Sequence, residues 1–217
     1  MKQHRQQLLL CLFILFAIVS PLWAQTPGPY LGLFVGGQLL APAKGEDSLG
    51  TFKLESKAAP SASVVLGWEL EPGSQIGEGR IELEYTRRSN SIDEAEFSDG
   101  TVPAKGDLIA DSLLVNFFGV YRNSSVWTPY GGAGLGIAKI SAADLTVTGQ
   151  PLTDDEALVF AYQLGCGVDV ALSEKLTLDF GYRFFSSSKA EFSETNGEKF
   201  DLSYLSHSAM VGLRLGF

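Results

Sequence analysis

The sequence predicts an all-β protein, an eight-stranded antiparallel up-and-down barrel that crosses a membrane. Three observations support this prediction. Eight segments alternate apolar and polar residues with a period of two, which is typical of strands with one apolar face. The connections between these segments alternate between short and long, and the charged residues fall almost entirely on one face of the strands. After the first 24 residues, no segment is apolar for long enough to form a spanning helix, so a membrane would be crossed by strands.

Residues 1–24 are predicted to be a secretory signal peptide. Lys2 and Arg5 give a positive start, an apolar run follows from Leu8 to Val19, and Ala24 is a small residue suited to cleavage. The run is shorter than the roughly 18 residues of a spanning helix. Cys11 lies inside the run, which argues against a lipoprotein. Residues 25–217 are therefore expected to form one barrel domain.

The charge of the expected mature chain excludes one class of partner. From residue 25 onward the chain has 14 basic and 25 acidic residues, a net charge of −11 at neutral pH. Such acidity argues against binding to nucleic acid and suits a surface exposed to solvent and divalent ions. Cys166 is the one cysteine in this part of the sequence, so no intrachain disulfide is expected.

The eight strands can be located by their alternation. The last strand ends on Phe217 with its apolar residues on one parity, and its edge requires a partner that the first strand of a closed barrel would supply. Each candidate has about nine to fifteen residues, enough to cross the hydrocarbon when tilted. The strands are expected at residues 30–39, 62–70, 80–88, 108–122, 128–140, 158–171, 175–185 and 206–217. Residues 108–122 give the least clear alternation because both faces are apolar.

The connections are expected to differ between the two ends of the barrel. Three are brief and turn-like, at residues 71–79, 123–127 and 172–174. Four are longer and polar and are interpreted as loops, at residues 41–61, 89–107, 141–157 and 186–203. Short turns at one end and long loops at the other are typical of bacterial outer-membrane barrels.

Charge placement predicts which face points inward. The polar parity of the strands carries five acidic and five basic residues, whereas the apolar parity carries only Lys139 and Lys175 near strand ends, where a lysine can snorkel. A charge at the middle of a lipid-facing surface costs about 2–4 kcal/mol, so the charges should lie inside the barrel and be paired. The predicted interior charge network consists of Glu69, Arg80, Glu82, Glu84, Asp169, Asp179, Arg183 and Arg214, with Arg88 and Arg122 on the same parity. This network is interpreted as a plug of ion pairs, with a narrow ion path lined by the same groups as the alternative.

Glycines and aromatic residues add two expectations. Gly132, Gly134 and Gly136 fall on the inward parity and should make room for charged side chains from across the lumen. Aromatic residues gather toward both ends of the oily face, as in the girdles of membrane barrels. The expected girdles are Trp68, Tyr121, Trp127 and Phe217 near the short turns, and Tyr85, Tyr162 and Phe184 near the other end.

Several segments resemble the small outer-membrane β-barrel family of Gram-negative bacteria. They are residues 127–136 (WTPYGGAGLG), 161–168 (AYQLGCGV), 176–184 (LTLDFGYRF) and 211–217 (VGLRLGF). This family includes opacity-type surface proteins, the outer-membrane-protein-A transmembrane domain and porin-family surface antigens. The likeness is strong over residues 110–217 and fainter over residues 28–90.

The resemblance implies an eight-stranded barrel in the cell outer membrane, in contact with lipid and lipopolysaccharide. It also implies insertion by the outer-membrane assembly machinery, whose recognition signal Val211, Leu213, Leu215 and Phe217 resemble. Members of the family range from adhesins that contact host or other extracellular ligands to structural proteins, so the motifs identify the scaffold.

No catalytic, cofactor or metal site is predicted. Some barrels of this size act on lipid A with a serine and a histidine on the lipid-facing surface. Here His207 is flanked by Ser206 and Ser208, and adjacent strand residues point to opposite faces, so the imidazole cannot reach either hydroxyl. His207 is expected in the upper interfacial belt instead. The acidic stretches 93–99 and 153–156 match no known calcium-loop spacing and are interpreted as solvated.

The sequence therefore favours a non-enzymatic outer-membrane barrel with four long extracellular loops that serve adhesion, host contact or antigenicity. Two alternatives are a narrow ion-conducting pore and a lipid A-modifying enzyme. A further alternative is a soluble secreted barrel that binds a small apolar ligand.

Overall fold

The computed structural model describes residues 27–46, 50–71, 73, 78–123, 125–195 and 197–217, and the predicted signal peptide lies outside them. Within these ranges, no helix is long and apolar enough to cross a membrane. The strands of the described chain are β1 (Gly28–Leu40), β2 (Ala43–Glu46), β3 (Thr51–Ser56), β4 (Ala59–Glu69), β5 (Gly79–Phe97), β6 (Gly100–Val120), β7 (Trp127–Val147), β8 (Gln150–Ala171), β9 (Leu176–Ser187), β10 (Ala190–Ser193), β11 (Lys199–Leu202) and β12 (Leu205–Gly216).

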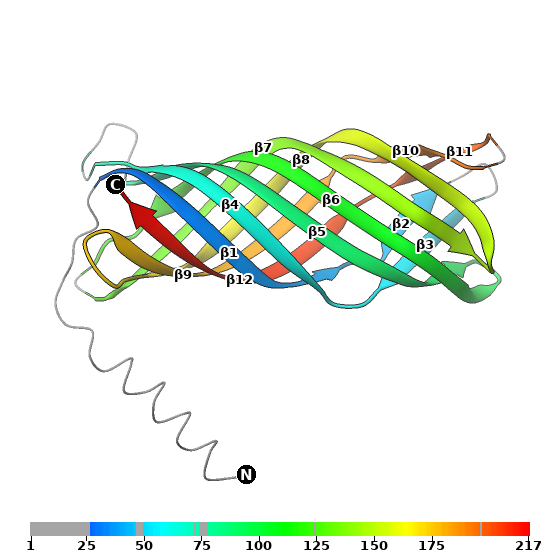
Figure 1. Cartoon of the computed structure of the whole chain (residues 1–217), viewed down its shortest axis with the longest axis horizontal. Helices are drawn as coiled ribbons and strands as arrows, with labels where there is room; N and C mark the ends of the chain where they lie inside the picture. The colour runs from blue at the N-terminus through cyan, green and yellow to red at the C-terminus, as the bar shows by residue number, and fades with distance from the viewer. Residues whose placement is uncertain (1–26, 47–49, 72, 74–77, 124, 196) are drawn as a thin grey trace, which may run out of the picture.

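Eight of these strands close into a barrel (Figure 1). In order around the barrel they are β1, β4, β5, β6, β7, β8, β9 and β12, and each pairs antiparallel with the next. The ring closes where β12 pairs with β1, with Leu215 opposite Leu31 and His207 opposite Leu39. The predicted eight-stranded up-and-down barrel is confirmed, including the pairing of the last strand with the first.

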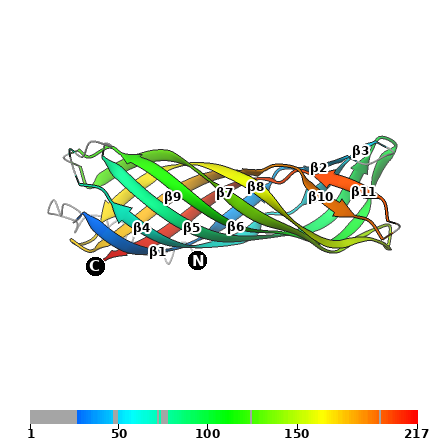
Figure 2. The same cartoon turned by 90° about the horizontal axis from the view of Figure 1, so that it is seen from above.

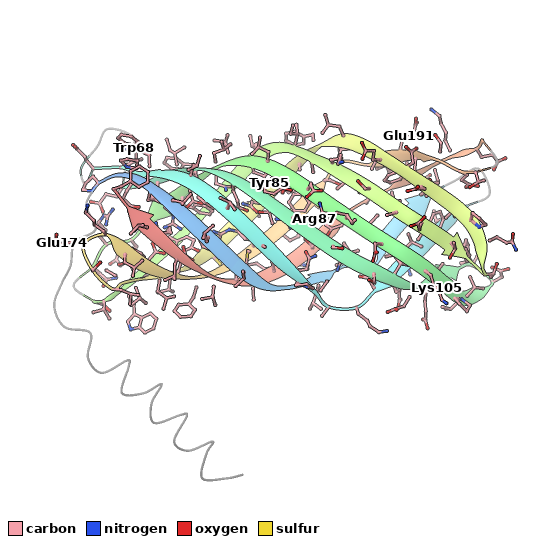
Figure 3. All side chains as sticks on the ribbon, viewed as in Figure 1. Trp68, Tyr85, Arg87, Lys105, Glu174 and Glu191 are labelled. Carbon is pink, nitrogen blue, oxygen red and sulfur yellow. The ribbon has the colours of Figure 1, made fainter. Side chains whose placement is uncertain are left out.

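The apolar parity of the strands faces outward, as predicted. It also carries two charged residues that the prediction left out, Arg87 and Asp111, which pair with each other at 2.8 Å. Leu33, Leu135 and Leu213 are 58, 61 and 48 % exposed, whereas the charged residues of the opposite parity are buried. Figure 3 shows side chains projecting all along the outer wall of the barrel, with Trp68 near one end. The continuous outward belt is the surface that hydrocarbon would cover. Every predicted girdle residue lies on this wall: Trp68, Tyr121, Trp127, Phe217, Tyr85 and Tyr162 are exposed, and Phe184 is half-buried.

The prediction of four long loops is wrong, because most of these residues form strands. β5 and β6 continue past the belt to a two-residue turn at Ser98 and Asp99, and β7 and β8 continue to a turn at Thr148 and Gly149. Thr148 and Gly149 have φ values of 52° and 80°, the positive values of a hairpin turn that suits the twist of the strands. The other two segments contain β2, β3, β10 and β11, which continue the same sheet.

These four segments, residues 41–61, 89–107, 141–157 and 186–203, are called the extension below. Its strands lie at the end of the barrel opposite the C-terminus and the short turns (Figures 1 and 2). The interior of the extension is apolar, whereas the lumen inside the apolar belt is polar and charged. The apolar cluster that fills this interior includes Phe52, Leu54, Ile92, Leu145, Phe192, Phe200 and Leu202 of the extension. Residues just outside the four segments belong to the same cluster: Leu108, Ile140, Phe185 and Tyr204. The molecule therefore has two different cores stacked along one barrel axis.

Leu135→Arg is expected to destabilise the barrel by about 2–4 kcal/mol, because it would place a charge in the middle of the apolar belt. Leu135 faces outward between Val115 and Tyr162 on the neighbouring strands. The matched control is Leu158→Arg. Leu158 is opposite Lys139, at the level where outward charged residues begin, and the same change there should cost less than about 1 kcal/mol. Urea unfolding in lipid vesicles measures both, and equal losses would show that Leu135 does not face hydrocarbon.

Candidate functional site

All eight residues of the predicted interior charge network lie inside the barrel, and none is more than 3 % exposed. They come from β4, β5, β8, β9 and β12, whose inward parity brings their side chains into one cross-section. This cluster is called the plug below. It consists of Glu69, Arg80, Glu82, Glu84, Asp169, Asp179, Arg183 and Arg214.

Arg80 is the centre of the plug. Its Nε donates to Oε1 of Glu82 at 2.6 Å, its Nη1 to Oδ2 of Asp169 at 2.8 Å, and its Nη2 contacts Oδ2 of Asp179 at 3.3 Å. The guanidinium also lies over the ring of Tyr130, 4.0 Å from its centroid. One cation thus joins three carboxylates, and the most distant of them, that of Asp179, is 99 residues from Arg80 in the chain.

Arg214 forms the second link. It contacts Asp169, Oδ2 of Asp179 at 3.6 Å and Oε2 of Glu69 at 3.4 Å. The half-buried Arg122 approaches from the short-turn end and donates to Oε1 of Glu69 at 2.7 Å. Arg122 therefore links the plug to the end of the barrel that carries the short turns.

Two tyrosines and a phenylalanine complete the packing of the plug. The hydroxyl of Tyr30 donates to Glu82 at 2.6 Å, and that of Tyr130 donates to Asp179 at 2.7 Å. Phe118 packs edge-on against Tyr130 and lies 4.7 Å from the guanidinium of Arg183. Phe118 explains why both faces of its strand look apolar in the sequence: one face meets lipid and the other carries a ring that packs on arginines.

Glu84 and Arg183 form the upper layer of the plug, with 3.8 Å between Oε2 of Glu84 and Nε of Arg183. Oε2 of Glu84 also accepts hydrogen bonds from the amides of Asn116 and Gln163, each at 3.1 Å. A buried charge is stable only when its polar atoms are satisfied in this way. Side chains thus bridge β5, β6, β8 and β9 across the lumen.

The glycine prediction needs a correction. Side chains added at Gly132 and Gly136 would meet the backbone of the neighbouring strand β6, and one at Gly134 would meet the side chain of Asn116. These glycines allow close approach to an adjacent strand. The glycines that leave room for an arginine are others, Gly165 and Gly181, where an added Cβ would come within 3.0 Å of Nη1 of Arg183.

His207 lies on the outer wall at the level of the upper girdle. Its Nδ1 is 2.6 Å from the hydroxyl of Tyr182, and its ring packs edge-on against Phe184. Ser206 and Ser208 are buried inside the lumen. The expectation that histidine and serines point to opposite faces is confirmed, so His207 forms no hydrogen bond with a flanking serine.

The two acidic stretches are used in structural contacts. Oδ2 of Asp155 accepts the amide of Ser193 at 2.9 Å, and Oδ1 accepts the amide of Glu156 at 2.8 Å. The Ser193 amide and then that of Glu156 hold the pKa of Asp155 below its ordinary value, so this tie between β8 and β10 persists at neutral pH and is lost as the pH falls through the lowered pKa. Asp93 pairs with Lys57 at 3.2 Å. No three His, Cys, Asp or Glu side chains of the described chain are grouped to hold a metal ion.

The extension carries almost all of the net charge of the chain. Its four segments contain sixteen acidic residues and six lysines, a net charge of −10 out of the −11 expected after the signal peptide. Several lysines are engaged within the extension, such as Lys53 with Glu96 at 3.0 Å. Further ion pairs there are Lys189 with Glu46 and Lys199 with Glu191.

The terminal strand β12 lies between β1 and β9. The residues predicted as the assembly signal share its outward face: Val211, Leu213, Leu215 and Phe217 are all exposed. The short turns and this strand end lie at the same end of the barrel (Figure 1).

Comparisons with known proteins agree with this architecture. Residues 9–215 match the family model of the outer membrane protein beta-barrel domain. The chain is 23 % identical over 151 residues to outer membrane protein PagN of Salmonella typhimurium, a match that covers 65 % of this chain and 63 % of PagN. The match thus spans less than two thirds of the length of that relative.

Two solved structures share the fold. Neisserial surface protein A superposes with a TM-score of 0.55 at 20 % identity, covering 88 % of this chain and 97 % of that one. OprG of Pseudomonas aeruginosa superposes with a TM-score of 0.57 at 12 % identity, covering 91 % and 100 %. With an outward apolar belt, an ion-paired lumen and a match over nearly the whole sequence, this chain belongs to the outer membrane protein beta-barrel domain family and is located in the cell outer membrane.

Proposed function

We propose that this outer-membrane protein is a non-catalytic surface-contact protein whose extension engages a partner outside the cell. The proposal rests on one observation, the division of the molecule into two parts. One part is a barrel filled by ion pairs, and the other is an extension that is built of strands and carries almost all of the net charge of the chain. Bacterial barrels place short turns in the periplasm and long connections outside. The extension would therefore project from the cell surface.

The charge of the extension indicates the chemistry of such a partner. A net charge of −10 repels polyanions and attracts positively charged surfaces or peptides over a distance of about 10 Å at moderate salt. Contact with lipopolysaccharide through bridging divalent ions follows the same logic and is part of the proposal. We also propose that the exposed face of β12, with Phe217 at its end, is the element that the assembly machinery recognises.

The contact role is tested by adherence of bacteria that lack other adhesins to cultured epithelial cells. Cells that make this protein should adhere more than cells without it, and the double variant Glu94→Gln with Asp154→Asn should lose most of the gain. Both acids are exposed on the extension. Raising the salt concentration should reduce the adherence of the unchanged protein, because exposed charges are screened.

The matched control is the double variant Glu71→Gln with Glu174→Gln, which removes the same charge from exposed residues at the short-turn end. It should adhere like the unchanged protein. Equal adherence with and without the protein would refute the contact role. The pore alternative is tested in planar bilayers, where steady single-channel steps from the unchanged protein would contradict a sealed plug.

A further inference from the structure

Arg88 differs from the other buried arginines of the described chain. Arg80, Arg183 and Arg214 each lie within 4.0 Å of at least one carboxylate oxygen. Arg88 is 1 % exposed, yet no carboxylate of the described residues lies within that distance. Its contacts are a hydrogen bond from Nη1 to Oγ of Ser112 at 2.8 Å and the ring of Phe185, 4.1 Å from the guanidinium. An unpaired buried charge is strongly unfavourable unless something compensates it.

Three buried serines lie on the inward faces of β4 and β12 near Arg88. Ser61 on β4 is directly opposite Arg88, and Ser206 on β12 is opposite Phe185, whose ring the guanidinium covers. Ser208, the next inward residue of β12, is opposite Arg183 and so lies on the side of the plug. The Oγ atoms of all three serines, and Nε of Arg88, are buried without a hydrogen-bond partner among the described residues.

The level of Arg88 lies between the two cores. Below it, the carboxylate of Glu84 is occupied by Arg183, Asn116 and Gln163. On its other side is the apolar core of the extension, which already includes Ala110, opposite Arg88, and Phe185, on whose ring the guanidinium lies. Neither side supplies a second charge that pairs with Arg88.

We propose that Arg88 and the hydroxyls of Ser61, Ser206 and Ser208 bind a small monovalent inorganic anion, such as chloride. All four groups can donate hydrogen bonds, and the guanidinium has no carboxylate oxygen of the described residues within 4.0 Å, so a small anion would meet donors and a positive charge there. Water would satisfy the hydroxyls but would not cancel the charge. A cation is excluded by Arg88 itself and by Arg183 one layer below. A bound anion would link β4, β5 and β12 where the polar lumen meets the apolar core. The site is independent of the proposed contact surface.

Bromide is the probe of choice, because it replaces chloride and scatters anomalously. The full mature chain, refolded from urea into detergent in sodium bromide and crystallised, should give an anomalous peak within about 3.5 Å of the Arg88 guanidinium, a contact distance for a large anion. The thermal midpoint should be about 3–5 °C higher in sodium chloride than in sodium gluconate at the same concentration, since gluconate is much larger than chloride and the four groups are buried.

Arg88→Met should abolish the difference between chloride and gluconate, whatever its effect on stability. Arg87→Met is the matched control, because Arg87 is adjacent but faces outward and pairs with Asp111 at 2.8 Å. The control should retain the difference. The proposal is overturned if bromide gives no peak at Arg88, if the unchanged protein is equally stable in both salts, or if Arg87→Met removes the difference as well. The diffraction result does not depend on whether the Arg88 variant folds.

Discussion

Arg80→Met is expected to lower the free energy of unfolding by about 3–5 kcal/mol, because it leaves buried carboxylates without their cation. Arg80 is fully buried and joins Glu82, Asp169 and Asp179. Arg214 still contacts the two aspartates, so they would crowd around a single cation, while Glu82 would keep only its bond from Tyr30 among these contacts. The loss should appear in urea unfolding of the barrel in vesicles and as a lower temperature at which the folded, fast-migrating gel band disappears.

The control for this prediction is Arg87→Met, which removes an exposed arginine from the same strand. Its pair with Asp111 is on the outer wall, where such pairs contribute about 0–1 kcal/mol. If the Arg80 and Arg87 variants were equally stable, the plug would not hold the barrel together. A partial return of stability when Glu82→Gln is added to Arg80→Met would show that the penalty arises from unpaired charge.

Phe200→Ala should destabilise the extension by about 3–5 kcal/mol, the usual loss for a large aromatic side chain removed from a core. Phe200 is 2 % exposed, and its ring centroid is 5.8 Å from that of Phe52 and 5.5 Å from that of Phe192. These contacts join β3, β10 and β11, each of which is too short to be stable alone. Limited proteolysis of intact cells should cut residues 186–203 much faster in the variant.

Lys199→Ala is the neighbouring control. Lys199 is exposed and pairs with Glu191 on the surface, so its loss should change the rate of cleavage little. The heat-resistant gel band of the barrel should survive Phe200→Ala, since the plug is a separate core. If the band were lost together with the extension, the two cores would unfold as one cooperative unit.

The two cores also use different basic residues. All six arginines after residue 24 belong to the barrel strands and their short turns, while all six basic residues of the extension are lysines. A guanidinium has five donors in a fixed plane and can bridge several carboxylates, as Arg80 does. A lysine carries a compact, strongly hydrated charge, so it is well placed on a solvated surface, where its ion pairs are weak.

Much of the fold could be predicted from the sequence, because strand parity is a local property. Adjacent residues of any strand, such as Leu83 and Glu84, point to opposite faces, so the apolar outer wall and the charged lumen were both predictable. The extension was not predictable in the same way, because its strands contain bulges. The register shifts between Ile92 and Glu94 and again between Ala142 and Leu145. Each shift moves the apolar residues to the other parity and erases the alternation that identifies a strand.

Residue types and their spacing were enough to predict the class of fold, the order of the strands, the face that meets lipid and the identity of the charges inside. The tertiary structure alone decided which charges pair, that the long connections form a second, apolar-cored part of the barrel, and that Arg88 has no carboxylate beside it. The reason is physical: alternation acts between neighbours in the chain, whereas an ion pair such as that of Arg80 and Asp169 joins residues 89 positions apart and exists only after the barrel closes.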